Sequence, residues 1–320
     1  MTAAETLGSL GEAAVLGRIF PRLPAAASEL LGPGDDAAVI ATPDGRVVIT
    51  TDMMIHGPDF RLAWSSPSDL GWKAAASNLA DVAAMGAVPT ALVVALAAPS
   101  DTPVAFMEAF ADGLREGCEA MAPGCGVVGG DLSVSAVLTI AVTAFGDLEG
   151  RDPVLRSGAR VGDVVAVSGP LGLAAEGLRL LFTHGVVEGE PDAPAAAAVA
   201  KEHPVPIAAQ LRPHPPIADG KAAAIAGATS MLDLSDGLAI DARRIAAASG
   251  VALTLRATPA ELGGGEDHSL LATFPPGAAL PAAFRPIGEV VEGEGVLVNG
   301  EPFGRRGGWD PYEDWNGKQG

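Results

Sequence analysis

The stretch RVVITTDMMIHGPDFRLAWSSPSDLGWKAAASNLADVAAMGAVPTALVVALA, residues 46–97, contains the pattern that decides the fold. It opens with a short β-branched run, Arg46–Thr51, which predicts a strand. The segment Pro67–Met85 predicts a helix, because Ser66 or Ser68 can serve as its N-cap and Gly86 follows its end. The apolar run Ala91–Ala97 predicts a second strand. The stretch therefore indicates a strand–helix–strand unit.

The same alternation continues through the rest of the chain. In the first half we expect a helix at Val104–Met121 and strands at Gly126–Val128 and Val137–Phe145. In the second half we expect strands at Asp163–Ser168, Met231–Leu234, Val251–Leu255, Leu270–Phe274 and Gly295–Val298, with helices at Leu173–Phe182 and Gly237–Ser249. A segment rich in glycine, proline and charge, Gly146–Arg160, separates the halves. The sequence thus predicts a mixed α+β or α/β protein with two lobes, residues 1–148 and 149–320, and a cleft between them.

Composition limits the classes of function. The 320 residues are 48% hydrophobic, enough for two packed cores, and they carry 39 acidic against 20 basic side chains, a net charge of −19. Such a charge disfavours binding to nucleic acid or to anionic membranes. Apolar runs are shorter than the ~18 residues of a membrane span. We expect a cytoplasmic protein, and we expect Cys118 and Cys125 to be reduced thiols.

Aspartates recur beside glycines and at the ends of predicted strands. They are Asp35, Asp36, Asp52, Asp131, Asp233 and Asp236. Acids in such places are typical of metal sites, because glycine allows close backbone approach and strand ends open into clefts. The ordinary alternative for any one of them is a turn or cap residue, and Asp236 is placed to cap the helix that follows it.

Asp81 differs, because it lies inside the predicted helix 67–85 among apolar neighbours. Lys73, Ser77 and Asp81 follow i, i+4, i+8 spacing and share a helix face with Asn78 alongside. This polar stripe is either a solvated edge or one wall of a site.

Converging carboxylates repel one another unless cations separate them. Mg²⁺ prefers carboxylate, water and phosphate oxygens, and it would also let an acidic protein bind a nucleotide. The five histidines show no paired-ligand spacing, which disfavours zinc. No Walker A motif or kinase glycine loop is present. The turn Gly169–Gly172 before a helix offers either an anion site or a packing turn.

Together the motifs resemble one family nearly from end to end: Gly34-Asp-Asp-Ala-Ala38, Thr50-Thr-Asp-Met53, Gly71-Trp-Lys-Ala74, Asn78-Leu-Ala-Asp81, Ala84-Met-Gly-Ala87, Gly129-Gly-Asp131, Leu155-Arg-Ser-Gly-Ala159, Gly162-Asp163, Leu211-Arg-Pro213, Leu232-Asp-Leu-Ser-Asp-Gly237, Gly264-Gly-Glu-Asp-His268 and Pro286-Ile-Gly-Glu289. The chain resembles the thiamine-monophosphate kinases. Their superfamily includes aminoimidazole-ribonucleotide synthetase and selenophosphate synthetase.

The resemblance implies an enzyme of thiamine diphosphate biosynthesis that transfers a phosphate of ATP to thiamine monophosphate. It implies a homodimer whose N-terminal lobes share a β-barrel, with ATP and several Mg²⁺ ions in the cleft. The implied metal ligands are Asp36, Thr50, Thr51, Asp52, Asp81, Asp131, Asp233 and Asp236. The implied ATP contacts are Gly130, Asp131, Arg156 and Ser235, the substrate contacts are Asp59, Glu266 and Trp309, and the catalytic residues are Asp81, Asp131 and Arg156.

These implied roles agree with phosphoryl-transfer chemistry, which needs positioning and charge neutralisation more than covalent help. The acceptor phosphate has a second pKa of about 6 and is already ionised, so no general base is required. Arg156 would add a fixed guanidinium; without the resemblance it reads as a surface arginine. Trp309 suits stacking on a thiazolium cation, or docking of the C-terminal segment.

The sequence departs from the family pattern in three places, and two alternatives stay open. Asp59 stands where the family usually carries a substrate-contacting histidine before phenylalanine, the ending reads Gly308-Trp-Asp-Pro-Tyr312, and the connection from Val251 to Gly263 is short. One alternative is an ATP-dependent synthetase of the same superfamily, which the lack of a reactive N-terminal cysteine disfavours. The other is a non-catalytic nucleotide-binding homologue.

Overall fold

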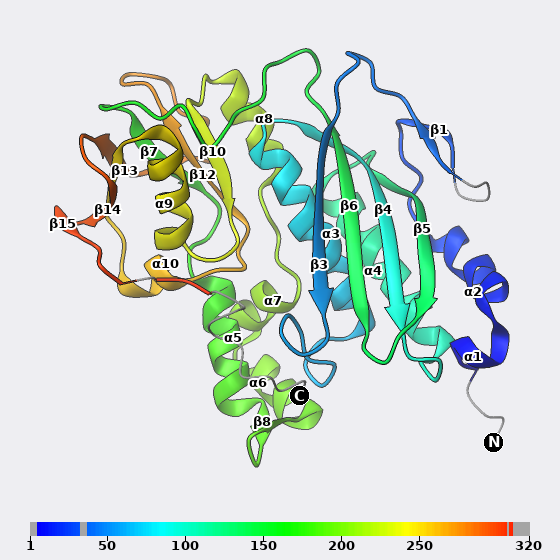
Figure 1. The fold of residues 1–320 in the computed structure, drawn as a ribbon. Helices are drawn as coiled ribbons and strands as arrows, with labels where there is room; N and C mark the ends of the chain where they lie inside the picture. The colour runs from blue at the N-terminus through cyan, green and yellow to red at the C-terminus, as the bar shows by residue number, and fades with distance from the viewer. Residues whose placement is uncertain (1–4, 33–36, 306, 310–320) are drawn as a thin grey trace.

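In a computed structural model of the chain, the structure describes residues 5–32, 37–305 and 307–309. The two larger sheets lie side by side, one in each half of the chain, and a group of helices extends below them in Figure 1. Asp35, Asp36 and the segment after Trp309 lie outside the described residues. The fold is mixed α/β.

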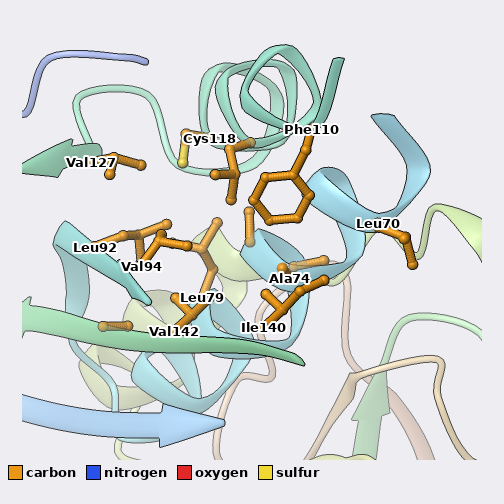
Figure 2. Packing of buried hydrophobic residues seen from close by; sticks show 14 of the residues in the cluster. Leu70, Ala74, Leu79, Leu92, Val94, Phe110, Cys118, Val127, Ile140 and Val142 are labelled. Atoms are coloured by element: carbon orange, nitrogen blue, oxygen red, sulfur yellow. The ribbon is translucent and has the colours of Figure 1, made fainter. Parts of the chain in front are cut away.

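The first sheet has four strands in the order β3-β6-β4-β5. The strands are β3 (Val48–Ile55), β4 (Val88–Ala98), β5 (Gly126–Val134) and β6 (Thr139–Asp147). Helices α3 (Pro67–Ala84) and α4 (Val104–Met121) pack on one face of it. Figure 2 shows the core between them, where Leu79, Phe110 and Cys118 of the helices point toward Leu92 and Ile140 of the sheet. Both cysteines are buried and free, as expected.

Two strands, β3 and β5, extend further than predicted, and this changes where the candidate residues Asp52 and Asp131 lie. β3 does not end before Asp52, because its ladder with β6 continues and pairs Asp52 with Val142. β5 likewise runs through the glycines, and Asp131 pairs with Ala95 of β4. These carboxylates therefore project from the faces of strands and not from loops at their ends.

The second sheet has seven strands in the order β10-β12-β7-β13-β11-β14-β15. They are β7 (Val164–Ser168), β10 (Ser230–Leu234), β11 (Ala252–Leu255), β12 (Ser269–Phe274), β13 (Arg285–Val291), β14 (Gly295–Val298) and β15 (Glu301–Pro302). Helices α9 (Leu238–Ser249) and α10 (Pro259–Gly263) contribute to one hydrophobic core, and α8 (Ile217–Ile225) contributes to another. Among these elements, the sequence prediction missed β13, β15, α8 and α10.

Helices α5 (Leu173–His184), α6 (Ala193–Glu202) and α7 (Pro204–Leu211) form the group below the sheets, with the short hairpin β8 (Val186–Val187) and β9 (Glu190–Pro191). Pro204 is the first residue of α7, where its missing N–H has no helical partner to lose. Near the N-terminus lie α1 (Leu7–Leu10), α2 (Glu12–Ile19), η1 (Phe20–Arg22), β1 (Glu29–Leu31) and β2 (Val39–Ile40). None of the helices in the described part of the chain combines the length and apolar character needed to cross a membrane.

Candidate active site

Acids from both lobes meet where α3 passes between the two sheets. Asp81 of α3 accepts a hydrogen bond from the Thr50 hydroxyl at 2.7 Å, and the backbone N–H of Asp52 donates to Asn78 at 3.2 Å. Burial, followed by the charges of Asp233 and Asp52, raises the pKa of Asp81 to about 7. Three carboxylates, two from the N-terminal lobe and one from β10, therefore repel one another at this point.

Acidic side chains of the second lobe also act on the carboxylate of Asp52. Burial is the main cause that raises the pKa of Asp52, and the charges of Asp233, Asp236 and Glu266 add to it, against the opposing effect of His268. Of these residues, only Asp52 belongs to the first sheet. The acids thus line the junction of the lobes, and we call Asp52, Asp81 and Asp233 the acid cluster.

His268 fixes the orientation of Asp233. Its Nδ1 lies 3.1 Å from Asp233 Oδ2, and both side chains are buried. Burial alone would lower the pKa of His268, but the hydrogen bond and charge of Asp233 outweigh it, so the pKa is raised. The sequence reasoning did not single out this histidine, although it belongs to the Gly264–His268 motif.

The segment that carries His268 has an unusual backbone. Glu266 (φ +68°) and His268 (φ +49°) both occupy the left-handed region, which non-glycine residues seldom adopt. The Glu266 N–H donates to the Ser235 carbonyl at 2.8 Å, which holds this segment against the loop after β10. Such strain is typical of functional sites.

The polar stripe of α3 faces the other lobe and not the solvent. Lys73 is 7% exposed, and its Nζ donates to the Gln210 carbonyl at 3.2 Å and forms a short ion pair with Glu266. Burial opposes ionisation of Glu266, but the charges of Lys73 and His268 and the hydrogen bonds from Lys73 and Gln210 together lower the pKa of that carboxyl. Ser77 and Asn78 are also buried. Of the two interpretations of the stripe, the structure favours the wall of a site.

Asp236 does not cap the helix that follows it, which rules out its ordinary alternative role. The N-cap is Gly237, which has no side chain to cap with, and Asp241 inside the helix accepts the backbone N–H groups of Asp236 (3.1 Å) and Gly237 (3.0 Å). Burial raises the pKa of Asp241 to about 7. Arg244 contacts both acids at 2.5 Å, so in this structure Asp236 is paired with an arginine.

The turn Gly169–Gly172 is a packing turn. The carboxylate of Asp267 accepts the N–H groups of Gly172 (2.5 Å), Leu173 (3.1 Å) and Ala174 (2.7 Å) at the start of α5. The anion at this helix N-terminus is therefore a side chain of the protein itself.

Two of the implied metal ligands lie apart from the acid cluster. Asp131 is on β5, three strand spacings or roughly 14 Å across the sheet from Asp52. By strand alternation, Asp131 and Thr51 point away from α3, whereas Thr50 and Asp52 point toward it. Within the described residues of one chain, the structure does not bring these two groups together.

Gly130 owes its identity to strand packing. A Cβ at this position would lie 2.0 Å from the carbonyl oxygen of Val94, so no other residue fits without a shift of β4 or β5. Arg156 is exposed, and it follows Leu155, whose carbonyl accepts the N–H of Met231 at the start of β10. The roles of Gly130 and Arg156 toward ATP stay predictions.

The implied substrate contacts lie on the border of the acid cluster. Asp59 Oδ2 accepts the Ile55 N–H at 2.7 Å, and burial raises the pKa of Asp59, with the charge of Glu266 acting in the same direction. The backbone N–H of Trp309 donates to the Asp236 carbonyl at 3.0 Å, which places this residue beside the loop after β10. Its side chain is 42% exposed and is free to stack on a ligand.

The donor set fits magnesium better than a metal held wholly by protein. Among the described residues, no three histidine, cysteine, aspartate or glutamate side chains are placed to share one ion. Mg²⁺ usually takes one or two carboxylates and completes its shell with water and phosphate oxygens. Burial and the charge of Asp233 raise the pKa values of both Asp52 and Asp81, and a bound cation would offset both effects. These residues therefore fit the ion.

Residues 34–148 match the family "AIR synthase related protein, N-terminal domain". The first sheet with its two helices thus defines the class as AIR synthase-related. A thiamine-monophosphate kinase of Mycobacterium tuberculosis (strain H37Rv) is 44% identical over 97% of this chain and 94% of its own length. The chain belongs to the thiamine-monophosphate kinase family.

Solved structures agree with this assignment. The structure of AaThiL complexed with AMPPCP and TMP has a TM-score of 0.72 at 33% identity, over 86% of this chain and 90% of that one. The thiamine-monophosphate kinase of Stenotrophomonas maltophilia K279a has a TM-score of 0.76 at 31% identity, over 90% of this chain and 96% of that one. The predicted family and the mixed α/β fold are confirmed.

Proposed function

We propose that this protein is an ATP-dependent kinase that phosphorylates thiamine monophosphate to thiamine diphosphate in the cytoplasm. The observation that carries the proposal is the meeting of Asp52, Asp81 and Asp233 from two lobes, with a pKa of about 7 at Asp81. Three carboxylates at one place repel one another, which disfavours folding, but they suit the binding of cations that in turn bind phosphates. The family membership and the AaThiL complex with AMPPCP and TMP support the choice of substrates.

In this mechanism the residues of the chain position and neutralise two anions. Asp52, Asp81 and Asp233 would hold Mg²⁺, with the Thr50 hydroxyl beside them, and the bound ions would supply charge neutralisation for the phosphates. His268 keeps the Asp233 carboxylate oriented toward the junction of the lobes. The acceptor phosphate attacks without deprotonation, because its second pKa of about 6 leaves it ionised. The chain therefore needs no general base.

The acceptor side of the site lies between the segment that carries Asp59 and the one that carries Glu266. The pKa of Asp59 is raised in part by the charge of Glu266 and opposed by that of Lys73, so these three side chains share one field. Glu266 provides a carboxylate near a thiazolium cation, and Lys73 fixes that carboxylate across the lobe junction. Trp309 adds an exposed aromatic ring.

One assay tests the proposal. Purified protein is incubated with ATP, Mg²⁺ and thiamine monophosphate, and thiamine diphosphate is measured by chromatography. We expect stoichiometric formation of ADP and thiamine diphosphate. Nucleotide binding without any turnover would favour the non-catalytic alternative, and ATP cleavage without thiamine diphosphate would favour a synthetase.

The open face of the first sheet supports a homodimer in which the sheets of two copies form a shared barrel. Ile49 and Met53 alternate with the residues that face α3, and they are 60% and 58% exposed. Thr51 and Asp131 lie on the same face. A second copy would cover the apolar side chains and would close the polar groups into the dimer.

Met53→Glu is expected to convert this dimer to a monomer. A carboxylate buried in the interface without a partner would raise the dimer dissociation constant at least about tenfold. Light scattering coupled to size-exclusion chromatography measures the mass. Val187→Glu, at an exposed position of strand β8, is the matched control and should leave the mass unchanged. A Met53→Glu protein that stays dimeric would remove this face from the interface.

A further inference from the structure

The loop between β3 and α3, residues 56–66, reaches across to the helices of the second lobe. Trp64 is 9% exposed, and it packs in a cluster with Leu180, Leu181 and Ile207 of α5 and α7. Its indole N–H donates to the Gly185 carbonyl at 2.8 Å, and its ring meets Phe182 edge-on at 4.9 Å. A side chain of the first lobe is thus built into the core of the helical group.

Arg61 of the same loop lies against aromatic rings, and the nearby charge that acts on it is that of Asp59. It is 8% exposed, and its guanidinium carbon lies 5.8 Å from the Trp64 ring centroid and 5.6 Å from that of Phe182. No hydrogen bond or ion pair joins its guanidinium to any residue in the described part of the chain. A cation removed from water is attracted to the faces of aromatic rings. We call Arg61, Trp64, Phe182 and Gly185 the clasp.

The clasp is connected to the acceptor side of the site by short, hydrogen-bonded backbone. The Trp64 N–H donates to the Arg61 carbonyl, and the Gly57 N–H donates to the Phe60 carbonyl, both at 3.0 Å. Asp59 lies inside the turn that the Gly57–Phe60 bond closes, and its carboxylate accepts the Ile55 N–H. Little slack remains between Trp64 and Asp59.

The N-terminus of α5 lies beside the segment that carries Glu266, the other implied acceptor contact. Asp267 binds the first N–H groups of α5, and Glu266 is its neighbour in sequence. The clasp holds the last turn of the same helix, through Phe182 and Gly185. Helix α5, with 12 residues and therefore about 18 Å long, connects the segment carrying Glu266 with the segment carrying Asp59.

We propose that Arg61 and Trp64 are positioning residues for the phosphate acceptor, because the clasp sets the distance between the Asp59 segment and the Glu266 segment. This inference rests on the proposed function. The acid cluster is fixed by β3, α3 and β10, so loosening the clasp leaves the nucleotide side in place. The clasp thus controls the KM of the acceptor and not that of ATP.

A second tryptophan provides the matched control. Trp72 of α3 also bridges the lobes, since its indole N–H donates to the Pro213 carbonyl at 2.6 Å and Arg212 lies 4.3 Å above its ring. It contacts the segment after α7 and not the loop 56–66. Trp72→Phe therefore removes the same kind of bond between the lobes without releasing the Asp59 segment.

The experiment compares Arg61→Met, Arg61→Lys, Trp64→Phe and Trp72→Phe with the wild type in the full-length protein. For each, KM for thiamine monophosphate, KM for ATP, kcat and the melting temperature are measured. Arg61→Met and Trp64→Phe should raise the acceptor KM about tenfold, with ATP KM and kcat within about twofold of wild type. Arg61→Lys keeps the cation and should restore most of the acceptor affinity. Trp72→Phe should lower the melting temperature and leave both KM values unchanged.

Three outcomes overturn the clasp: an unchanged acceptor KM in Arg61→Met, an equal rise of both KM values, or the same acceptor effect from Trp72→Phe. Each of them is compatible with an active wild type, so the proposed function survives. A wild type that makes no thiamine diphosphate overturns the proposed function, and the acceptor role of the clasp with it.

Discussion

Asp81→Asn is expected to lower kcat about a thousandfold while making the metal-free protein more stable. Asp81 lies at the centre of the acid cluster, so asparagine leaves the shape of the site intact and removes the charge that holds the cations and, through them, the phosphates. The same substitution removes the repulsion with Asp52 and Asp233 that raises the pKa of Asp81 to about 7. Loss of activity and gain of stability therefore have one cause.

Steady-state assays with saturating ATP and Mg²⁺ measure the first effect, and urea denaturation in EDTA measures the second. Asp152→Asn removes an equal charge from a fully exposed side chain and should change neither quantity. Turnover near the wild-type rate would take Asp81 out of the site. A destabilised apoprotein would show that its carboxylate serves the fold.

The sequence predicted best those elements whose signals are local. The bounds of α4 matched the prediction, and α3 ended one residue early. Its cap is a local signal too, because Ser66 and Asp69 form a reciprocal capping box. Strands β3 and β5 ran past their predicted ends, because the ladder that extends them depends on β6 and β4. No local pattern at Asp52 or Asp131 reports that partner.

In the candidate site, too, local sequence signals identified some residues, whereas their partners come from distant segments. Residue type and setting selected Asp52, Asp81 and Asp233, and the structure brings them together. The partners that tune them come from distant segments: His268 for Asp233 and Glu266 for Lys73. Asp241 accepts the backbone N–H groups of Asp236 and Gly237, and the sequence alone does not show which of the two nearby aspartates has this role. Contacts of this kind follow from the tertiary fold.

The clasp had no signal in the sequence. Trp64 and Gly185 are 121 residues apart, and neither belongs to a motif that carries the resemblance. A lone tryptophan in a loop is ordinarily a core residue of its own lobe. Only the packing of α5 and α7 shows that this one is buried in the other lobe.

Asp81 should make the metal-free protein less stable as the pH rises, and bound Mg²⁺ should reverse this trend. A folded-state pKa of about 7 against an ordinary value of 3.8 means that the folded protein binds this proton more tightly than the unfolded chain does. The contribution of Asp81 is therefore favourable near pH 4 and is lost as the pH rises toward 7, a change of about 4 kcal/mol at most. Mg²⁺ binds the ionised carboxylate, so it should stabilise the protein more at pH 8 than at pH 5.

Other carboxyl groups titrate in the same range, and Glu149 has a lowered pKa that acts in the opposite direction. The unfolding free energies of wild type and Asp81→Asn are therefore measured at each pH in EDTA, and their difference isolates Asp81. Between about pH 4 and pH 7, the unfolding free energy of the wild type should fall relative to that of Asp81→Asn. Added Mg²⁺ should restore the wild type at pH 8 and leave Asp81→Asn nearly unaffected. A difference that is flat with pH, or an equal gain from Mg²⁺ in both proteins, would mean that the acids at the lobe junction neither repel one another nor hold the ion.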